Sequence, residues 1–404
     1  MRGDRIVIVG ASLAGLRAAE ELRHLGHEGP IALVGDEERK PYDRPPLSKQ
    51  VLAGARPPEA TTLEVTSGSV EDLAIEWHLG ERATGLDLQG QRVHLAGRDS
   101  LPYDGLVIAT GASARHLPGT EGTEGVFTLR TLDDCLAIRA GLDARPSRVV
   151  VIGAGFIGAE VAATCRGLGL EVTLVEALPV PLERALGAEM GAVMADLHRD
   201  QGVDVRLGVG VAQLEGRGRV ESVALSDGSA IDADLVVVGI GVVPNTEWLQ
   251  GSGLTIEDGV VCDASCRAAP DVVAAGDVAR WPNPRFGEVM RVEHWDNAIE
   301  MGAHAARTLL AGPAGGDAFA PVPWFWSDQY DRKLQLAGRA SAGDDVEVVS
   351  GSLEERRFVA FYGRGGRLVG VLGMNQPAKV MKWRALLESP TPWDQALAAA
   401  KAAA

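Results

Sequence analysis

The sequence is poor in cysteine, in aromatic residues and in positive charge, and each shortage excludes a class of protein. Of 404 residues only four are cysteine and 5% are aromatic, and the net charge is −16. The cysteines form neither a C-x-x-C pair nor a set spaced for zinc, so we expect no metal site. The negative charge argues against nucleic acid or an anionic membrane surface as a partner.

Long hydrophobic runs are also missing. Nowhere do 18 uninterrupted apolar residues occur, so we expect no membrane span. The start, "MRGDRIVIVGASLAG", does not have the layout of a signal peptide, because its apolar stretch reads as a strand entering a glycine turn. The C-x-x-x-C spacing of Cys262 and Cys266 lies in a strand and turn, and we interpret it as incidental. These features together predict a cytoplasmic protein with reduced thiols.

Glycine, by contrast, is abundant, with 50 residues in a chain long enough for two or three domains. Residues 5–10, "RIVIVG", have the pattern of a buried parallel strand. A turn, "GASLAG", a helical stretch and a second strand that ends at Asp36 follow. This order is the dinucleotide-binding fingerprint, with Gly10 at the tight turn and Gly15 at the close helix–strand contact. The middle glycine is replaced by Ser12, which weakens the match.

The same unit recurs about 140 residues later, in complete form. Residues 148–153, "RVVVIG", lead into "GAGFIG", which supplies Gly153, Gly155 and Gly158, and the next strand ends at Glu176. One such unit alone fits any strand–helix–strand motif with a glycine turn. Two complete units predict either two bound dinucleotides, or one dinucleotide and a degenerate copy of its site.

Other strands also end in small residues. They are "LVIATGA" (106–112), "LVVVGIGVVPN" (235–245) and "DVVAAGDVA" (271–279). Asp277, after Gly276, suits a polar ribityl or phosphate group, although Gly-Asp is also a common turn.

With both fingerprints and these strand ends in order, the chain resembles the two-dinucleotide-fold flavoprotein disulfide reductase superfamily over almost its whole length. The resemblance implies an α/β fold with two Rossmann-like domains, one for FAD and one for NAD, and a C-terminal α+β domain. The expected boundaries are 1–113 and 246–321 for the FAD-binding domain, 114–245 for the NAD-binding domain, and 322–404 for the C-terminal domain.

The loop at 42–49, "YDRPPLSK", narrows the resemblance. Disulfide-active members carry a cysteine pair in this loop, whereas the first cysteine of this chain is Cys135. Together with "EHWDNAIEMGAHAA" (293–306) and "WFWSDQYDRKLQLAG" (324–338), the loop resembles that of the oxygenase-coupled FAD-dependent ferredoxin reductases. These enzymes take a hydride from NADH and pass single electrons to an iron–sulfur ferredoxin that serves a monooxygenase or dioxygenase. A rubredoxin reductase, an NADH oxidase on the same scaffold and a non-catalytic nucleotide-holding module remain alternatives.

The resemblance also implies site residues. Lys49 matches a cation beside the flavin and Glu160 a position facing the nicotinamide, and we expect these two to be catalytic. Glu160 could instead be a solvated acid at a helix start, and Arg130 could be a surface ion pair. Trp326 could be core rather than a flavin contact. The remaining positions expected to bind FAD or NAD are Gly10, Ser12, Leu13, Ala14, Gly15, Asp36, Arg44, Pro45, Ala83, Thr110, Gly111, Arg130, Gly153, Gly155, Phe156, Ile157, Gly158, Glu176, Gly241, Gly276, Asp277, Glu293, His294, Trp295 and Trp326.

A partner surface is predicted as well. Ferredoxins of this kind are usually acidic, so an acidic reductase needs a local basic patch to meet one quickly. Two stretches are locally basic, "DRKLQLAGR" (331–339) and "AKVMKWR" (378–384). The second offers Lys379, Lys382 and Arg384 on a broad shared side of a helix, unless this is only a solvated helix face, and Arg332, Lys333 and Arg339 of the first are the next candidates. We expect the protein to be a monomer or a weak dimer.

Overall fold

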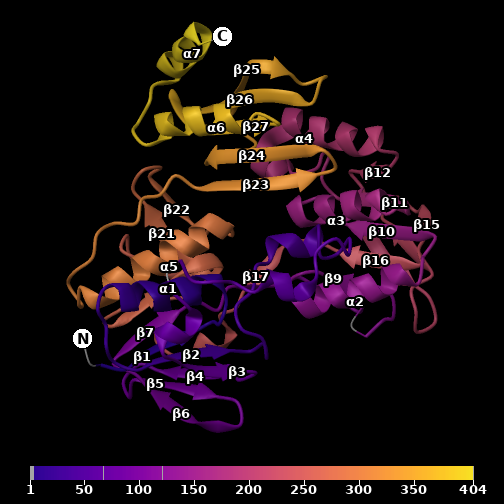
Figure 1. Cartoon of the computed structure of the whole chain (residues 1–404). Helices are drawn as coiled ribbons and strands as arrows, with labels where there is room; N and C mark the ends of the chain where they lie inside the picture. The colour runs from indigo at the N-terminus through magenta and orange to yellow at the C-terminus, as the bar shows by residue number, and fades with distance from the viewer. Residues whose placement is uncertain (1–3, 67, 121, 404) are drawn as a thin grey trace. The chain divides into compact units, whose positions relative to one another are not determined.

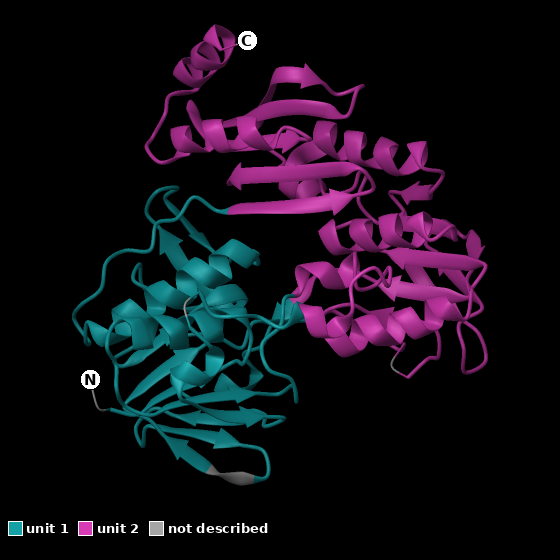
Figure 2. Cartoon of the chain, viewed as in Figure 1, with its two compact units in different colours: residues 1–43, 61–113, 243–323 teal, residues 44–60, 114–242, 324–404 magenta. Residues whose placement is uncertain are grey.

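The computed structural model describes residues 4–66, 68–120 and 122–403. The chain forms two compact units, each assembled from separate stretches of sequence (Figure 2). Unit 1 comprises residues 1–43, 61–113 and 243–323, and unit 2 comprises residues 44–60, 114–242 and 324–404.

Unit 1 is built on a six-stranded sheet with the order β19-β20-β7-β1-β2-β3 (Figure 1). Its central strands are short, rich in Val and Ile, and completely buried, as expected for parallel strands covered on both faces. Ile6 lies opposite Ile31 on one side and Gly105 on the other, both in parallel register. The strands of this sheet are β1 (Ile6–Val9), β2 (Ile31–Gly35), β3 (Ile75–Leu79), β7 (Gly105–Ile108), β19 (Arg267–Ala269) and β20 (Val272–Ala274).

Two helices of unit 1, α1 (Leu13–His24) and α5 (Trp295–Leu310), pack very closely. A Cβ added at Gly302 would lie 2.5 Å from the carbonyl oxygen of Ala14, so only glycine permits this crossing. Two smaller sheets complete the unit, with the orders β4-β5-β6 and β18-β21-β22. Their strands are β4 (Ala83–Asp87), β5 (Arg92–Leu95), β6 (Arg98–Pro102), β18 (Val260–Val261), β21 (Ala279–Asn283) and β22 (Glu288–Met290).

Unit 2 contains a second parallel sheet, with the order β12-β11-β10-β16-β9. Helix α2 begins at a capping box between Thr131 and Asp134, which fixes its first residue. The strands are β9 (Val126–Thr128), β10 (Arg148–Ile152), β11 (Glu171–Glu176), β12 (Asp204–Leu207) and β16 (Leu235–Val238). The helices are α2 (Leu132–Asp143), α3 (Phe156–Gly167) and α4 (Glu183–Asp200). A small antiparallel sheet of unit 2 contains β13 (Val211–Glu215), β14 (Ser222–Leu225) and β15 (Ala230–Asp232). Strands β8 (Ala112–Ala114) and β17 (Val242–Pro244) form a separate pair, and most of their residues belong to unit 1.

The C-terminal part of unit 2 is an antiparallel sheet with the order β23-β24-β27-β26-β25. One face of this sheet packs on α4, where Leu186 and Met190 join Leu334 and Phe358 in one hydrophobic cluster. The elements are β23 (Trp324–Gln329), β24 (Arg332–Gly338), β25 (Asp345–Ser352), β26 (Arg357–Arg364), β27 (Arg367–Met374), α6 (Pro377–Arg384) and α7 (Trp393–Ala402). The expected fold class, two Rossmann-like parts and a C-terminal α+β part, is confirmed.

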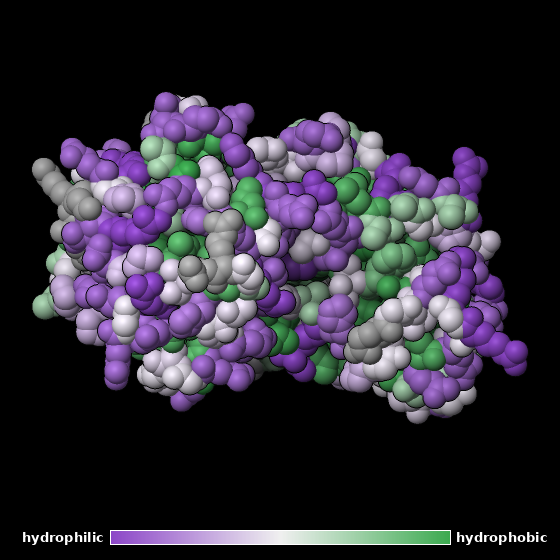
Figure 3. Space-filling view, turned by 90° about the horizontal axis from the view of Figure 1, so that it is seen from below, coloured by the Kyte–Doolittle hydropathy of each residue, from purple (hydrophilic) through white to green (hydrophobic). Residues whose placement is uncertain are grey.

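Short 3-10 helices occur at Pro45–Ser48, Pro58–Thr61, Val70–Leu73, Glu247–Leu249, Gly276–Val278 and Ala385–Leu387. In the described part of the chain, no helix has the length and apolar character needed to cross a membrane. On the face shown in Figure 3, hydrophobic residues appear as separate patches among hydrophilic ones.

Candidate functional site: two dinucleotide cradles and a buried ion pair

The glycine turn of unit 1 is fixed by two close backbone approaches. Gly10 has φ +126°, and a Cβ there would lie 2.0 Å from the carbonyl oxygen of Ala109. A Cβ at Gly15 would lie 2.0 Å from the carbonyl oxygen of Gly10. Both glycines are therefore required, and they bring the start of α1 directly against the end of β1.

The turn of unit 2 repeats this geometry. Gly153 has φ +96°, and its added Cβ would lie 2.4 Å from the Gly239 carbonyl oxygen. A Cβ at Gly158 would meet the Gly153 oxygen at 2.0 Å. At Gly155, however, the nearest described atom to an added Cβ is 4.0 Å away. Packing within the protein does not demand glycine there, and the missing side chain leaves room for a ligand to approach the backbone. Ser12 occupies the equivalent place in unit 1.

Both helices that follow these turns begin without a cap. Within the described residues, α1 has no side-chain bond from its N-cap Ser12, and α3 has none from its N-cap Gly155. Neither helix has an acid in its first turn. Such an N-terminus presents N–H groups and a positive dipole end, which together suit a pyrophosphate. The residues present therefore fit one dinucleotide at each turn.

An acid follows the second strand of each unit, as expected. In unit 2 the Glu176 carboxylate is held by two backbone amides: Oε2 accepts from Ala154 N at 2.7 Å and Oε1 from Leu178 N at 2.9 Å. Asp36 in unit 1 is more open, with its side chain 64% exposed and 3.8 Å from Arg82. The unit 2 acid is thus pre-oriented, whereas that of unit 1 faces solvent.

Further residues expected to bind FAD meet at the carboxyl edge of the unit 1 sheet. Thr110 Oγ1 donates to the Asn245 carbonyl at 2.8 Å, just beyond β7. Gly276, with φ +76°, lies beside α1, because its added Cβ would be 3.1 Å from the Ala14 Cβ. Trp295 Nε1 donates to Asp43 Oδ1 at 2.8 Å. The other expected positions of unit 1 are Leu13, at the start of α1, Ala83, at the start of β4, Gly111 with φ +64°, Asp277 in a 3-10 helix, Glu293, which pairs with Arg291, and His294, the N-cap of α5.

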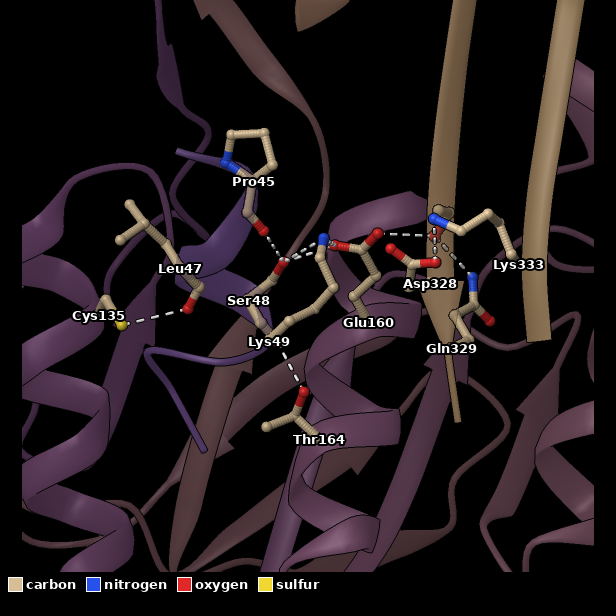
Figure 4. A network of polar contacts seen from close by, with 11 residues as sticks. Pro45, Leu47, Ser48, Lys49, Cys135, Glu160, Thr164, Asp328, Gln329 and Lys333 are labelled. Carbon is tan, nitrogen blue, oxygen red and sulfur yellow. Dashed lines mark hydrogen bonds and ion pairs between the residues drawn. The ribbon is translucent and has the colours of Figure 1, made fainter. Parts of the chain in front are cut away.

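Residues 44–49 of the proline loop (42–49) belong to unit 2, and Lys49 at the end of this loop forms a buried ion pair with Glu160 of α3 (Figure 4). Lys49 Nζ lies 2.6 Å from Glu160 Oε2, and the Glu160 side chain is only 4% exposed. Ser48 Oγ donates to the same oxygen at 2.5 Å, and Ser327 Oγ donates to Oε1 at 2.7 Å. A buried ion pair is stable only when such additional hydrogen bonds satisfy it. The alternative that Glu160 is a solvated helix-start acid is therefore wrong.

The loop is anchored to its surroundings on both sides. Its first cation, Arg44, donates to the Arg130 carbonyl at 2.6 Å. Pro45 then begins a 3-10 helix, and Thr164 Oγ1 of α3 donates to the Ser48 carbonyl at 2.7 Å. The stiff prolines thus hold Lys49 over α3. Unit 2 also holds Phe156 and Ile157 at the start of α3 and Gly241, with φ +97°, after β16.

Strand β23 presents different side chains on its two faces, as the alternation in the sequence indicates. Phe325 contacts Phe156 edge-on, with 4.5 Å between ring centroids. Trp324 and Trp326 are half-buried and lie against each other at 5.3 Å. A contact of Trp326 with a flavin stays a prediction.

Sequence reasoning missed Ser48, Ser327, Gln329 and Cys135. The first three stand inside the motifs quoted above, and period-2 alternation along "FWSDQ" would have placed Ser327 and Gln329 on one face. Cys135 carried no signal, yet its Sγ donates to the Leu47 carbonyl at 3.1 Å in the proline loop.

The four cysteine thiols are buried in surroundings that disfavour the reactive thiolate form. All four cysteines are free and buried. Burial raises the pKa of Cys135 to about 11 and the pKa values of Cys165 and Cys262 to about 12. The pKa of Cys266 is raised well above its usual value by the same cause. The reactive thiolate is therefore scarce at neutral pH.

Comparison with known proteins identifies the family to which the chain belongs. Residues 4–302 match the model of the pyridine nucleotide-disulphide oxidoreductase family, and residues 324–404 match a reductase C-terminal domain. The chain is 41% identical to rhodocoxin reductase of Rhodococcus erythropolis, covering 96% of this chain and 90% of that protein. It is 38% identical to putidaredoxin reductase of Pseudomonas putida, covering 96% and 93%.

A solved structure of similar fold supports this family assignment. The reductase in the covalent putidaredoxin reductase–putidaredoxin complex superposes with a TM-score of 0.89 at 36% identity, covering 95% of this chain and 93% of that one. The resemblance drawn from the motifs is thereby confirmed, and the chain belongs to the pyridine nucleotide-disulphide oxidoreductase family, whose members contain FAD and use NAD(H).

Proposed function

We propose that this protein is an NADH-dependent ferredoxin reductase, which transfers electrons from NADH through FAD to an iron–sulfur ferredoxin that serves an oxygenase. The observation that carries the proposal is that the proline loop holds Lys49, paired with Glu160 of α3, and no cysteine. The four thiols of the chain are buried, and burial raises their pKa values. Electrons therefore leave without passing through protein sulfur. The relatives named above are reductases of this kind.

In this proposal, residues of unit 1 bind FAD and residues of unit 2 bind NADH. The α1 N-terminus and Asp36 would hold the pyrophosphate and a ribose of FAD, and the α3 N-terminus and Glu176 would do the same for NADH. Bound FAD would supply the hydride-accepting and one-electron chemistry. Lys49 would supply a fixed positive charge for that chemistry. Glu160 holds the Lys49 ammonium in place.

The acceptor is tested by a coupled assay. The FAD-loaded protein, NADH and cytochrome c are mixed with and without an added ferredoxin. We expect cytochrome c reduction to depend on ferredoxin and to saturate with it. Equal rates without ferredoxin, accompanied by oxygen consumption, would establish the NADH oxidase alternative instead. Saturation by a rubredoxin, but by no ferredoxin, would establish a rubredoxin reductase.

The boundaries expected from the sequence form part of this proposal: residues 1–113 and 246–321 for FAD, 114–245 for NAD and 322–404 for the C-terminal domain. A cytoplasmic location is also proposed, since four free thiols suit a reducing compartment. Gel filtration at micromolar concentration tests the expected monomer or weak dimer.

A further inference from the structure

The inner face of β23 carries a row of buried polar side chains directly behind Glu160. Ser327 is 0% exposed and Gln329 is 1% exposed, and they alternate along the strand with Trp326 and Asp328. The C-terminal sheet therefore turns polar groups, not only Phe325, toward α3 (Figure 4). Buried polar groups carry a desolvation cost unless they are paired, so their hydrogen bonds identify what they do.

The donors to Glu160 come from separate segments of the chain. Lys49 and Ser48 both reach Oε2, whereas Ser327 is the donor recorded at Oε1 among the described residues. If the Ser327 hydroxyl were lost, Oε1 would be a buried carboxylate oxygen without that donor. The carboxylate could then rotate about its last side-chain bond, and the Lys49 ammonium bound to it would move as well.

Gln329 fixes the direction of the Ser327 hydroxyl. Gln329 Nε2 donates to Ser327 Oγ at 3.1 Å. A hydroxyl has one proton and can accept as well as donate. Because Gln329 donates to the oxygen, the proton of Ser327 is left to point at Glu160. Gln329 thus donates to Ser327, and Ser327 donates to Glu160, whose other carboxylate oxygen accepts from Lys49.

We propose that Ser327 and Gln329 are positioning residues for Glu160, through which the C-terminal sheet sets the geometry of the Lys49–Glu160 pair. This inference rests on the proposed function. It assigns the C-terminal part of the chain a role in the NADH half-reaction, in addition to any role toward the electron acceptor.

The test uses the FAD-loaded protein with ferricyanide as acceptor, so that no ferredoxin is needed. Ser327→Ala should lower kcat/KM for NADH by about five- to tenfold, as expected for the loss of one hydrogen bond of ordinary strength. Ser327→Thr, which keeps the hydroxyl, should stay within about twofold of wild type. Gln329→Met, which keeps the length but loses the donor, should lower kcat/KM by about threefold. Ser352→Ala, a half-buried serine of the same sheet, is the matched control and should change nothing.

A double-mutant cycle separates positioning from structure. In a Glu160→Gln background, adding Ser327→Ala should cost less than about twofold, because the carboxylate that it positions is already gone. Calorimetric titration with NAD⁺ gives a second readout: Ser327→Ala should weaken NAD⁺ binding about threefold, but not when Glu160 is Gln.

An equal loss in both backgrounds would overturn the inference, as would unchanged kinetics and NAD⁺ affinity in Ser327→Ala. If Ser327→Ala does not fold, Gln329→Met decides by the same criteria. The proposed function fails separately, through loss of ferredoxin dependence in wild type, whereas this inference can fail while that dependence persists.

Discussion

His198 makes the stability of this protein depend on pH in a way that the structure allows us to calculate. The side chain lies on α4, is 0% exposed, and has Nδ1 2.8 Å from the Tyr330 hydroxyl. Burial lowers its pKa to about 4, and the Gln329 side chain opposes this lowering in part. In the unfolded chain a histidine titrates near pH 6.5.

The sign follows from proton binding. Between about pH 6.5 and pH 4 the unfolded state holds a proton on His198 that the folded state does not hold, so stability falls as the pH falls through this window. A difference of about two and a half pH units corresponds to about 3 kcal/mol of unfolding free energy. Above pH 6.5 the group is neutral in both states and its contribution is constant.

Replacing His198 by Asn keeps a polar atom for Tyr330 but removes the titration. We expect His198→Asn to be less stable than wild type at pH 7.5, by about 1 kcal/mol for the imperfect hydrogen bond. This difference should shrink and then reverse toward pH 4.5. Urea unfolding of the FAD-loaded protein across this pH range measures it, with the exposed His24→Asn as the control. Parallel pH curves for wild type and His198→Asn would refute the reasoning.

Three further predictions concern turnover. If Glu176 binds NADH as proposed, its carboxylate would accept from the ribose 2′-hydroxyl and repel a 2′-phosphate, so kcat/KM should favour NADH over NADPH. Glu176→Ala with a nearby arginine should relax the preference, and an NADPH value equal to that of NADH in wild type would contradict the prediction. Lys49→Met should slow flavin reduction in rapid mixing about ten- to a hundredfold, the effect of one lost charge contact of about 1.5–3 kcal/mol, and an unchanged rate would leave Lys49 a purely structural role. On α6, Lys379 and Lys382 are exposed. Exchanging both for Glu should raise KM for ferredoxin and flatten its dependence on salt, while ferricyanide reduction is unchanged. If neither the KM for ferredoxin nor its salt dependence changes, ferredoxin binds elsewhere on the protein.

The sequence by itself determined the local architecture. The Gly10 and Gly153 turns could be predicted because their positive φ and their contacts below 2.5 Å exclude any other residue. Completely buried parallel strands appear as short β-branched runs, and β23 appears as an alternation, because each pattern depends on neighbours along the chain. The two glycine fingerprints predict bound dinucleotides, and the resemblance to a known family implied that these are FAD and NAD.

Only the tertiary structure decided the surroundings of Glu160. The two serines that bind its carboxylate come from 112 and 167 residues away in the sequence, and no periodicity records such a meeting. For the same reason the sequence left open whether Glu160 was solvated, and it did not foresee Cys135 against the proline loop. The charge of a carboxylate can be read from the sequence, but its burial, its partners and therefore its chemistry depend on which distant segments the fold packs against it.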